Sequence, residues 1–519
     1  MTKRTHRDRS TRPQSHPVAR TPSPPPRRER RLLYAAALAG GFVVSRLLYW
    51  SIGVRFDSSS LGWYWQYVDP VLLKYDLVRS LVYLHSQPPL FNLFLGLVLK
   101  LFPGHEATAF QLTFLALGLM LTLSMFFLMV RLGAPLILAA ALTGVFMLSP
   151  AAILYENHLL YSYPIAALLC AAALCLHRFV AARRARDGLA FFTLLASLVY
   201  LRSVFHWVWF VFFVALLSFH LRADRKRILL TAAVPALLVA ALYAKNQMIF
   251  GTSVTSSWLG MNLSRMTTFR LPREERAAMV QAGQLSELAL AGIFQSVDLY
   301  RQHFPWVPSA TTGIPVLDQV RKQNGELNLN HLAYIEISRR FARDALQVIR
   351  LRPGVYLHCL LRTYFIFFVP ASDYGFLSER NRAAIGSWEG LFDAVVNLRF
   401  QRHDVYKLED ERARSPLAYY EHNIFNMGWS LLLAYCLVVA YGFRHCRAAF
   451  RRAPADLPLV LTGAFLWISI VYVTVLGNAL EYGENNRFRF DIDPLIFALL
   501  AVALPVLWKR GSDMLAGRR

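Results

Sequence analysis

The sequence predicts an all-α, polytopic membrane protein with about ten transmembrane helices, external surface helices and an external helical segment. Long apolar runs alternate with short arginine-rich segments, and 55% of the 519 residues are hydrophobic. Both features are typical of helical membrane proteins. The net charge of +24 would indicate a nucleic-acid partner in a soluble chain. In a membrane protein it is expected to collect on one side of the bilayer, so no nucleic-acid binding is predicted.

The N-terminal residues 1–31 form a basic tail rich in Pro, Ser and Thr, with little apolar surface to bury, which predicts disorder. The apolar run from Leu32 follows a tail too long and too basic for an ordinary signal peptide and lacks a small-residue cleavage site. It is therefore expected to be a signal anchor with a cytoplasmic N-terminus. The five cysteines mostly lie in or beside apolar runs, so no external disulfide framework is predicted.

Apolar stretches long enough to cross the bilayer, alone or as a broken pair, define the domain organisation. Predicted spans are residues 32–53, 107–131, 134–155, 159–181, 188–203, 204–220, 227–248, 425–444, 457–479 and 490–508. The expected regions are a transmembrane core at 32–248 with a first external loop at 54–106, an external helical segment at 249–424, C-terminal transmembrane helices at 425–508 and a basic cytoplasmic tail at 509–519.

The charges on the connections orient these spans. The N-terminal tail, alternate connections and C-terminal tail carry 27 of the 56 Lys and Arg residues but only six acidic residues. Almost all of the net charge then lies on one side, as the positive-inside rule requires. The chain is expected to cross the plasma membrane several times with both termini in the cytoplasm.

This orientation holds only if two further apolar stretches, 88–103 and 355–371, do not cross the bilayer. The first begins with "PPL" and carries Gln87, Asn92 and Lys100 within or just before it, which favours a helix lying along the outer surface. The second, "VYLHCLLRTYFIFFVP", is also expected to be an interfacial helix. A third irregularity is the run 188–220, which is interrupted at "YLRSVFHW" and predicts two short helices meeting at an outer turn.

Ionisable side chains gather at the predicted external ends of the spans, where charge is costly and therefore indicates function. A carboxylate close to an acceptor hydroxyl can act as a general base, and guanidinium groups suit a phosphate. The predicted catalytic carboxylates are Asp69, Asp57 and Glu156, and the predicted substrate-binding residues are Asp76, Gln87, Arg202, His206, Arg487 and Arg489. No metal ligands are assigned.

Structural alternatives exist for most of these residues. Asp69 precedes Pro70, as an N-cap precedes the first residue of a helix. Arg487 and Arg489 can pair with Glu481 and Glu484 in an external loop. Tryptophans such as Trp63, Trp65, Trp207 and Trp258 can stack on a sugar or form an interfacial belt.

Four stretches together resemble the GT-C glycosyltransferases, in particular bacterial proteins of the protein O-mannosyltransferase and aminoarabinose transferase type. They are the long first external loop with its aspartates, the "PPL" helix ending in "LVLKLFPG", the segment "LSPAAILYENHLLY" and the late "ENNRFRFDIDPL". The resemblance is best over residues 32–260. Gln87 stands where the family commonly has His, and the first loop lacks the family's Asp-Glu pair. Asp69 therefore matches the catalytic aspartate by its distance to Gln87, and Asp57 by its place after the first span.

The resemblance implies hexosyl or pentosyl transfer from a polyprenyl-phosphate-linked donor to a lipid, glycan or protein acceptor in the cell envelope. An aspartate would deprotonate the acceptor hydroxyl, and arginines would hold the lipid phosphate. No cofactor is implied, although carboxylates can hold a divalent metal ion. The alternative is a membrane transporter or lipid flippase of the envelope, which also places charged groups within a helical bundle. A non-catalytic envelope assembly protein is a third possibility.

Overall fold

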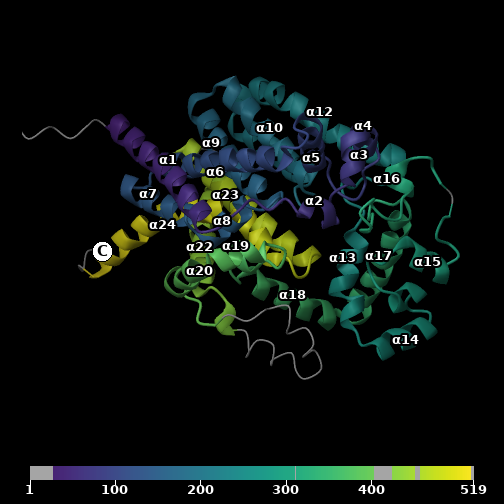
Figure 1. The fold of residues 1–519 in the computed structure, drawn as a ribbon. Helices are drawn as coiled ribbons and strands as arrows, with labels where there is room; N and C mark the ends of the chain where they lie inside the picture. Colours follow the sequence, from purple (N-terminus) through teal and green to yellow (C-terminus); the bar gives the residue numbers. More distant parts are fainter. Residues whose placement is uncertain (1–26, 310, 402–423, 451–455, 516–519) are drawn as a thin grey trace, which may run out of the picture.

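The computed structural model describes residues 27–309, 311–401, 424–450 and 456–515. Within these ranges the regular secondary structure is helical, with two isolated bridges and no strand (Figure 1). The predicted all-α, polytopic class is confirmed. The predicted tail falls almost entirely outside the described residues, except that the first helix already begins at Arg27.

Seven helices in the described residues are long and apolar enough to cross a membrane. They are α1 (Arg27–Ser51), α6 (Glu106–Arg131), α9 (Ser162–Ala182), α12 (Arg225–Phe250), α22 (Trp429–Ala449), α23 (Leu457–Leu480) and α24 (Asn485–Leu515). Helices α1 and α12 expose many leucines and valines, as expected for surfaces that face lipid. Helix α9 is buried along most of its length and contacts α6, α10, α23 and α24.

One predicted span is bent. Helices α7 (Leu136–Met147) and α8 (Pro150–Glu156) meet at 57° and would raise the number of spans to eight. The bend follows from the sequence "SP", because Pro150 has no N–H to continue α7, while the Ser149 side chain accepts a hydrogen bond of 3.2 Å from the Ala152 N–H and starts α8.

The predicted interruption within 188–220 is confirmed. Helix α10 (Ala185–Leu201) ends before Arg202, which has an extended backbone, and α11 (Trp207–His220) begins after His206. With 17 and 14 residues, neither helix reaches the roughly 20 residues of a straight span. The total of about ten spans therefore stays a prediction.

The segment predicted to be the first external loop forms four short helices: α2 (Ser60–Trp63), α3 (Pro70–Tyr75), α4 (Leu77–Val82) and α5 (Leu90–Leu101). Helix α5 corresponds to the predicted surface helix and has 12 residues. Helix α18 (Pro353–Phe367), which corresponds to the second, has 15. Neither is among the helices long enough to span a membrane. Their position along the outer surface stays a prediction.

The segment between α12 and α18 contributes α13 (Leu259–Met266), α14 (Arg273–Gln281), α15 (Val297–His303), α16 (Pro315–Asp318) and α17 (Ala333–Leu351). These helices gather on one side of the molecule, away from α1 and α7 (Figure 1). They enclose small hydrophobic cores of their own, including Tyr300, Tyr334 and Phe341. Helices α13 and α17 pack so closely at Gly260 that a Cβ atom there would collide with the Ser338 carbonyl oxygen. Helices α19 (Glu379–Ala384) and α20 (Gly386–Phe392) follow α18.

Candidate functional site

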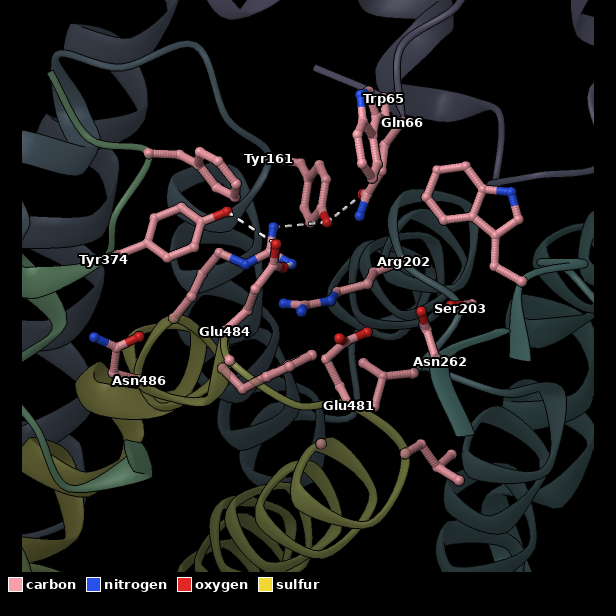
Figure 2. A pocket seen from close by; sticks show the side chains of 18 of the residues that line it. Trp65, Gln66, Tyr161, Arg202, Ser203, Asn262, Tyr374, Glu481, Glu484 and Asn486 are labelled. Atoms are coloured by element: carbon pink, nitrogen blue, oxygen red, sulfur yellow. Dashed lines mark hydrogen bonds and ion pairs between the residues drawn. The ribbon is translucent and has the colours of Figure 1, made fainter. Parts of the chain in front are cut away.

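A cavity of about 1300 Å³ lies where candidate membrane-spanning helices meet the segments that connect them. Its wall combines the α10–α11 turn, the α23–α24 turn, the α2–α3 connection, α13 and residues 373–376. Figure 2 shows Trp65 and Gln66 at one side of the cavity, Tyr374 at the other and Arg202 between them. The cavity therefore joins segments that are hundreds of residues apart in the sequence.

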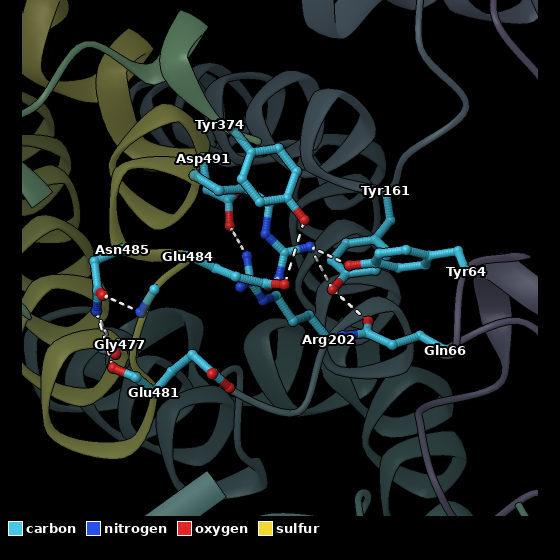
Figure 3. A network of polar contacts seen from close by, with 12 residues as sticks. Tyr64, Gln66, Tyr161, Arg202, Tyr374, Gly477, Glu481, Glu484, Asn485 and Asp491 are labelled. Atoms are coloured by element: carbon cyan, nitrogen blue, oxygen red, sulfur yellow. Dashed lines mark hydrogen bonds and ion pairs between the residues drawn. The ribbon is translucent and has the colours of Figure 1, made fainter. Parts of the chain in front are cut away.

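Arg487 is the central cation of the cavity. Its side chain is almost fully buried, with 1% of the residue exposed. One terminal nitrogen donates to the hydroxyl oxygens of Tyr64, at 2.9 Å, and Tyr161, at 2.8 Å, while the other pairs with the Glu484 carboxylate (Figure 3). Its Nε has no hydrogen-bond partner among the described residues. This N–H is itself buried, so an anion in the cavity would compete with Glu484 for the terminal N–H groups of Arg487.

Arg202 is the second cation. Its guanidinium pairs with Asp491, lies 3.8 Å above the ring of Phe488 and faces the ring of Tyr161 at 5.5 Å. Aromatic faces stabilise a guanidinium without using its N–H donors. Arg202 and Arg487 thus approach the same cavity with aromatic support on both sides.

Two glutamates on the α23–α24 turn supply negative charge. Glu484 pairs with Arg487, and Glu481 lies 3.7 Å from Arg265 on α13. Burial and the neighbouring Glu484 carboxylate raise the pKa of the Glu481 carboxyl group to about 7. A carboxyl group with such a pKa can accept a proton near neutral pH.

The turn that carries these glutamates is held by asparagine side chains. The Asn485 amide donates to Asn478 Oδ1 at 3.1 Å and to the Glu481 carbonyl oxygen at 3.0 Å, and Asn485 Oδ1 accepts from the Gly483 N–H at 3.0 Å. Gly483 has φ +98°, a conformation that favours glycine. The sequence "EYGENN" therefore orders the loop locally and directs both glutamates to the cavity.

Four of the predicted substrate-binding residues line the cavity: Gln87, Arg202, His206 and Arg487. His206 also caps α11, because its Nδ1 accepts from the Val208 N–H at 3.4 Å. The predicted convergence of two arginines from unrelated segments is therefore present. It involves Arg487, and Arg489 is not among the residues that line the cavity.

Arg489 and Asp76 occupy other positions. Arg489 is buried, where it pairs with Asp493 at 3.2 Å and donates to the carbonyl oxygens of Phe367 and Val369 at 3.0 and 2.9 Å. Because residues two apart on a helix point about 200° away from each other, α24 cannot direct both Arg487 and Arg489 to one cavity. Asp76 is half-buried between α3 and α4.

The predicted catalytic carboxylates do not line the cavity in the part of the chain that the structure describes. Asp69 is 4% exposed and caps α3, accepting from the Val71 N–H at 2.9 Å and from the Gln323 N–H at 2.7 Å. Asp69 therefore has the helix-cap role that the sequence offered as the structural alternative to catalysis. The Asp69 carboxylate also links the start of α3 to the connection between α16 and α17, where Gln323 lies.

Asp57 lies beside His158, with which it forms an isolated parallel bridge. Its Oδ1 accepts from the Ser59 N–H at 2.9 Å, and its Oδ2 lies 3.6 Å from His158 Nδ1. The adjacent His158 imidazole and the Ser59 hydrogen-bond donor hold the pKa of the Asp57 carboxyl group well below its usual range. A carboxylate that holds its proton so weakly is a poor general base.

Glu156 is buried in the bundle with 1% of the residue exposed. Its two oxygens accept from Nε and a terminal nitrogen of Arg46, both at 2.8 Å, and one also accepts from the Tyr163 hydroxyl at 2.6 Å. Gly118 leaves room for this group, since a Cβ atom there would collide with Glu156. The Glu156 carboxylate therefore joins α1 to α8.

Sequence reasoning assigned no catalytic or binding role to Glu481, Glu484 or Asp491, and weighed the glutamates only as partners of the late arginines. The signal was the spacing: Glu484, Arg487 and Asp491 are three and four residues apart, which places them on one face of the helix that begins at the turn. No group of three His, Cys, Asp or Glu side chains suited to a metal ion occurs among the described residues.

Comparisons with protein-family models, curated proteins and solved structures found no match to this chain.

Proposed function

We propose that the chain is an integral membrane glycosyltransferase that moves a sugar from a polyprenyl-phosphate-linked donor to an acceptor in the cell envelope. The main support is that cationic and acid–base groups occur together in one cavity. Two buried arginines, Arg202 and Arg487, share it with Glu481, a carboxyl group whose pKa is raised to about 7.

The arginines suit the phosphate of the donor. Planar guanidinium groups provide several N–H donors and keep their charge at all physiological pH values. Apolar side chains of Val204, Leu476 and Leu480 line the same cavity beside them. A lipid phosphate requires this combination, because its head is anionic and its chain is apolar.

Glu481 is the proposed general base. In the transfer, the acceptor oxygen forms a bond to the anomeric carbon of the sugar while the bond between that carbon and the phosphate oxygen breaks. The acceptor proton passes to Glu481, and the polyprenyl phosphate leaves with the bonding electron pair. Arg202 and Arg487 stabilise the negative charge that develops on the leaving phosphate. Asp57, Asp69 and Glu156 are engaged in structural contacts. We therefore assign the role of general base to Glu481 instead.

Sugar transfer by the full-length protein in proteoliposomes tests this proposal. Radiolabelled polyprenyl-phosphate sugars are supplied with an envelope extract as acceptor, and release of free polyprenyl phosphate is measured. We expect Glu481→Gln and Arg487→Met to lower the release by roughly 100-fold or more, a typical loss for a general base or an anion-stabilising group. Glu274→Gln on α14 is the control, because Glu274 is exposed.

Sugar transfer unaffected by either substitution would refute the site assignment. Movement of the labelled lipid between leaflets without cleavage of the sugar–phosphate bond would instead favour a flippase.

A further inference from the structure

Two groups of aromatic side chains line opposite parts of the cavity. The first, called here the external aromatic group, consists of Trp65, Phe294 and Trp258. The Phe294 ring lies 5.8 Å from that of Trp65 and 5.7 Å from that of Trp258. The second, the inner aromatic group, consists of Trp63, Tyr374 and Phe376. The Phe376 ring lies 5.4 Å from those of both Trp63 and Tyr374. Figure 2 shows Trp65 and Tyr374 across the pocket from each other.

The short sequence "WYWQ" at 63–66 connects the two groups. Tyr64 accepts a hydrogen bond from Arg487 at 2.9 Å, and Gln66 accepts one from the Tyr161 hydroxyl. Trp63 and Trp65, on either side of Tyr64, join the inner and external groups respectively. The proposed phosphate site therefore lies between two aromatic surfaces that are two residues apart along the chain.

Both groups leave a large aromatic surface uncovered. Trp65 is 42% exposed and Phe376 is 47% exposed, although each also packs on other rings. An exposed apolar surface within a cavity is typical of a binding site, whereas rings that serve only the core are buried.

The backbone of Phe294 supports the same conclusion. Its φ is +54°, a left-handed conformation that a bulky side chain seldom adopts. Such strain persists where the surrounding structure imposes it, and it is concentrated at ligand sites. Here the conformation places the Phe294 ring between Trp65 and Trp258.

The polar groups near the external aromatic group are mostly uncharged. They include Gln66, Ser256 and Asn262, which lie within four residues of Trp65 or Trp258 in the chain. Four of the five cavity arginines, Arg202, Arg265, Arg399 and Arg487, already have carboxylate partners. The fifth, Arg382, donates to the Tyr374 carbonyl oxygen at 2.6 Å. The occupant expected from these groups has many hydroxyls, little or no negative charge and flat apolar faces that stack on aromatic rings. Pyranose sugars have all three properties.

We propose that the acceptor is an oligosaccharide whose sugar rings stack on Trp65 and Phe294 at one side of the cavity and on Trp63 and Phe376 at the other. This inference rests on the proposed function, because it places the acceptor beside the phosphate and Glu481. It selects a glycan among the lipid, glycan and protein acceptors.

Oligosaccharide binding without any donor tests the inference separately from catalysis. Neutral tetrasaccharides of glucose, mannose and N-acetylglucosamine, in α- and β-linked forms, are titrated into the full-length protein in nanodiscs, and binding is followed by saturation-transfer NMR and calorimetry. We expect at least one of them to bind, with sugar-ring protons as the contact. Trp65→Leu should weaken binding about tenfold, since it keeps apolar volume but removes the aromatic face, whereas Trp65→Phe should retain most of the affinity.

Trp508→Ala is the control, because Trp508 is 81% exposed on α24 and does not line the cavity. Thermal unfolding of each variant checks that the fold is kept.

The outcomes separate the two proposals. If no tetrasaccharide binds, or if Trp65→Leu binds as tightly as the parent protein, the glycan acceptor is refuted, while transfer to a lipid or protein can still be observed. If a tetrasaccharide binds in the predicted way but no donor sugar is transferred to it or to any envelope acceptor, the glycosyltransferase proposal fails and a glycan-binding site remains.

Discussion

Glu484 pairs with the arginine that we propose to bind the donor phosphate, and this pairing leads to a quantitative prediction. Its carboxylate pairs with Arg487, so a bound phosphate has to compete with it for the same guanidinium N–H groups. Glu484→Gln keeps the shape and a hydrogen-bond acceptor but removes the competing charge. We therefore expect the variant to bind polyprenyl phosphate more tightly.

The magnitude follows from the burial of the pair. The Arg487 side chain is 2% exposed and that of Glu484 is 18% exposed, so the pair lies between an exposed ion pair, worth up to about 1 kcal/mol, and a buried one, whose disruption costs about 3–5 kcal/mol. Because solvent partly screens Glu484, we expect polyprenyl phosphate to bind the Glu484→Gln variant about 1–2 kcal/mol more tightly. This corresponds to a dissociation constant lower by roughly 5- to 30-fold.

The assay is binding of a short-chain polyprenyl phosphate to the full-length protein in nanodiscs, measured by calorimetry. Glu379→Gln is the matched control, since Glu379 also lines the cavity but is exposed. A second measurement uses the same variant. The Glu484 charge contributes to the raised pKa of Glu481, so its removal lowers that pKa and shifts the acidic limb of the pH–rate profile to lower pH. Weaker phosphate binding together with an unmoved pH profile would refute the reasoning.

Three further predictions concern the pH dependence and the carboxylates outside the cavity. A general base must be deprotonated to act, so the transfer rate should rise with pH through about 7. Initial rates between pH 5 and 9 test this, and the rise should be absent in the Glu481→Gln variant. Glu156→Gln should lower the free energy of unfolding by about 3–5 kcal/mol, because the Arg46 charge stays buried without its partner; thermal unfolding checks this, and a fully stable variant would contradict it. Asp69→Ala should lower stability by about 1 kcal/mol through loss of the α3 cap while sugar transfer persists, whereas complete loss of transfer in a folded protein would restore Asp69 as the catalytic base.

Several structural features could be predicted from local sequence alone. Asp69 before Pro70 indicated a helix cap, and the polar interruption around Arg202 and His206 indicated a break between two helices. These features depend on residues that are neighbours in the chain, so their spacing is sufficient to identify them.

The site could be predicted only in part, and α24 explains why. The last span was expected to begin at residue 490, which left Arg487 and Arg489 in a loop where both could reach one pocket. The helix begins at Asn485, so the two arginines point in different directions and find different partners, Glu484 and Asp493. A shift of five residues in one helix start thus changed the membership of the site.

Buried charge pairs were a second limit on predicting the site from the sequence. Glu156 was predicted to be functional because charge within a membrane is costly. That reasoning identifies a group that needs a partner, but it does not identify the partner. Arg46 lies 110 residues earlier, and only the packing of α1 against α7 and α6 brings it to Glu156.

The sequence by itself determined the class of this protein, because apolar helices form from local composition and their backbone hydrogen bonds close within each helix. It also determined where helices break, through Pro, Gly and capping side chains. The tertiary structure decided which charges are neutralised inside the bundle and which remain available in the cavity. The physical reason is that an ion pair depends on a separation of a few ångströms between side chains that are often more than a hundred residues apart, and that separation is set by helix packing.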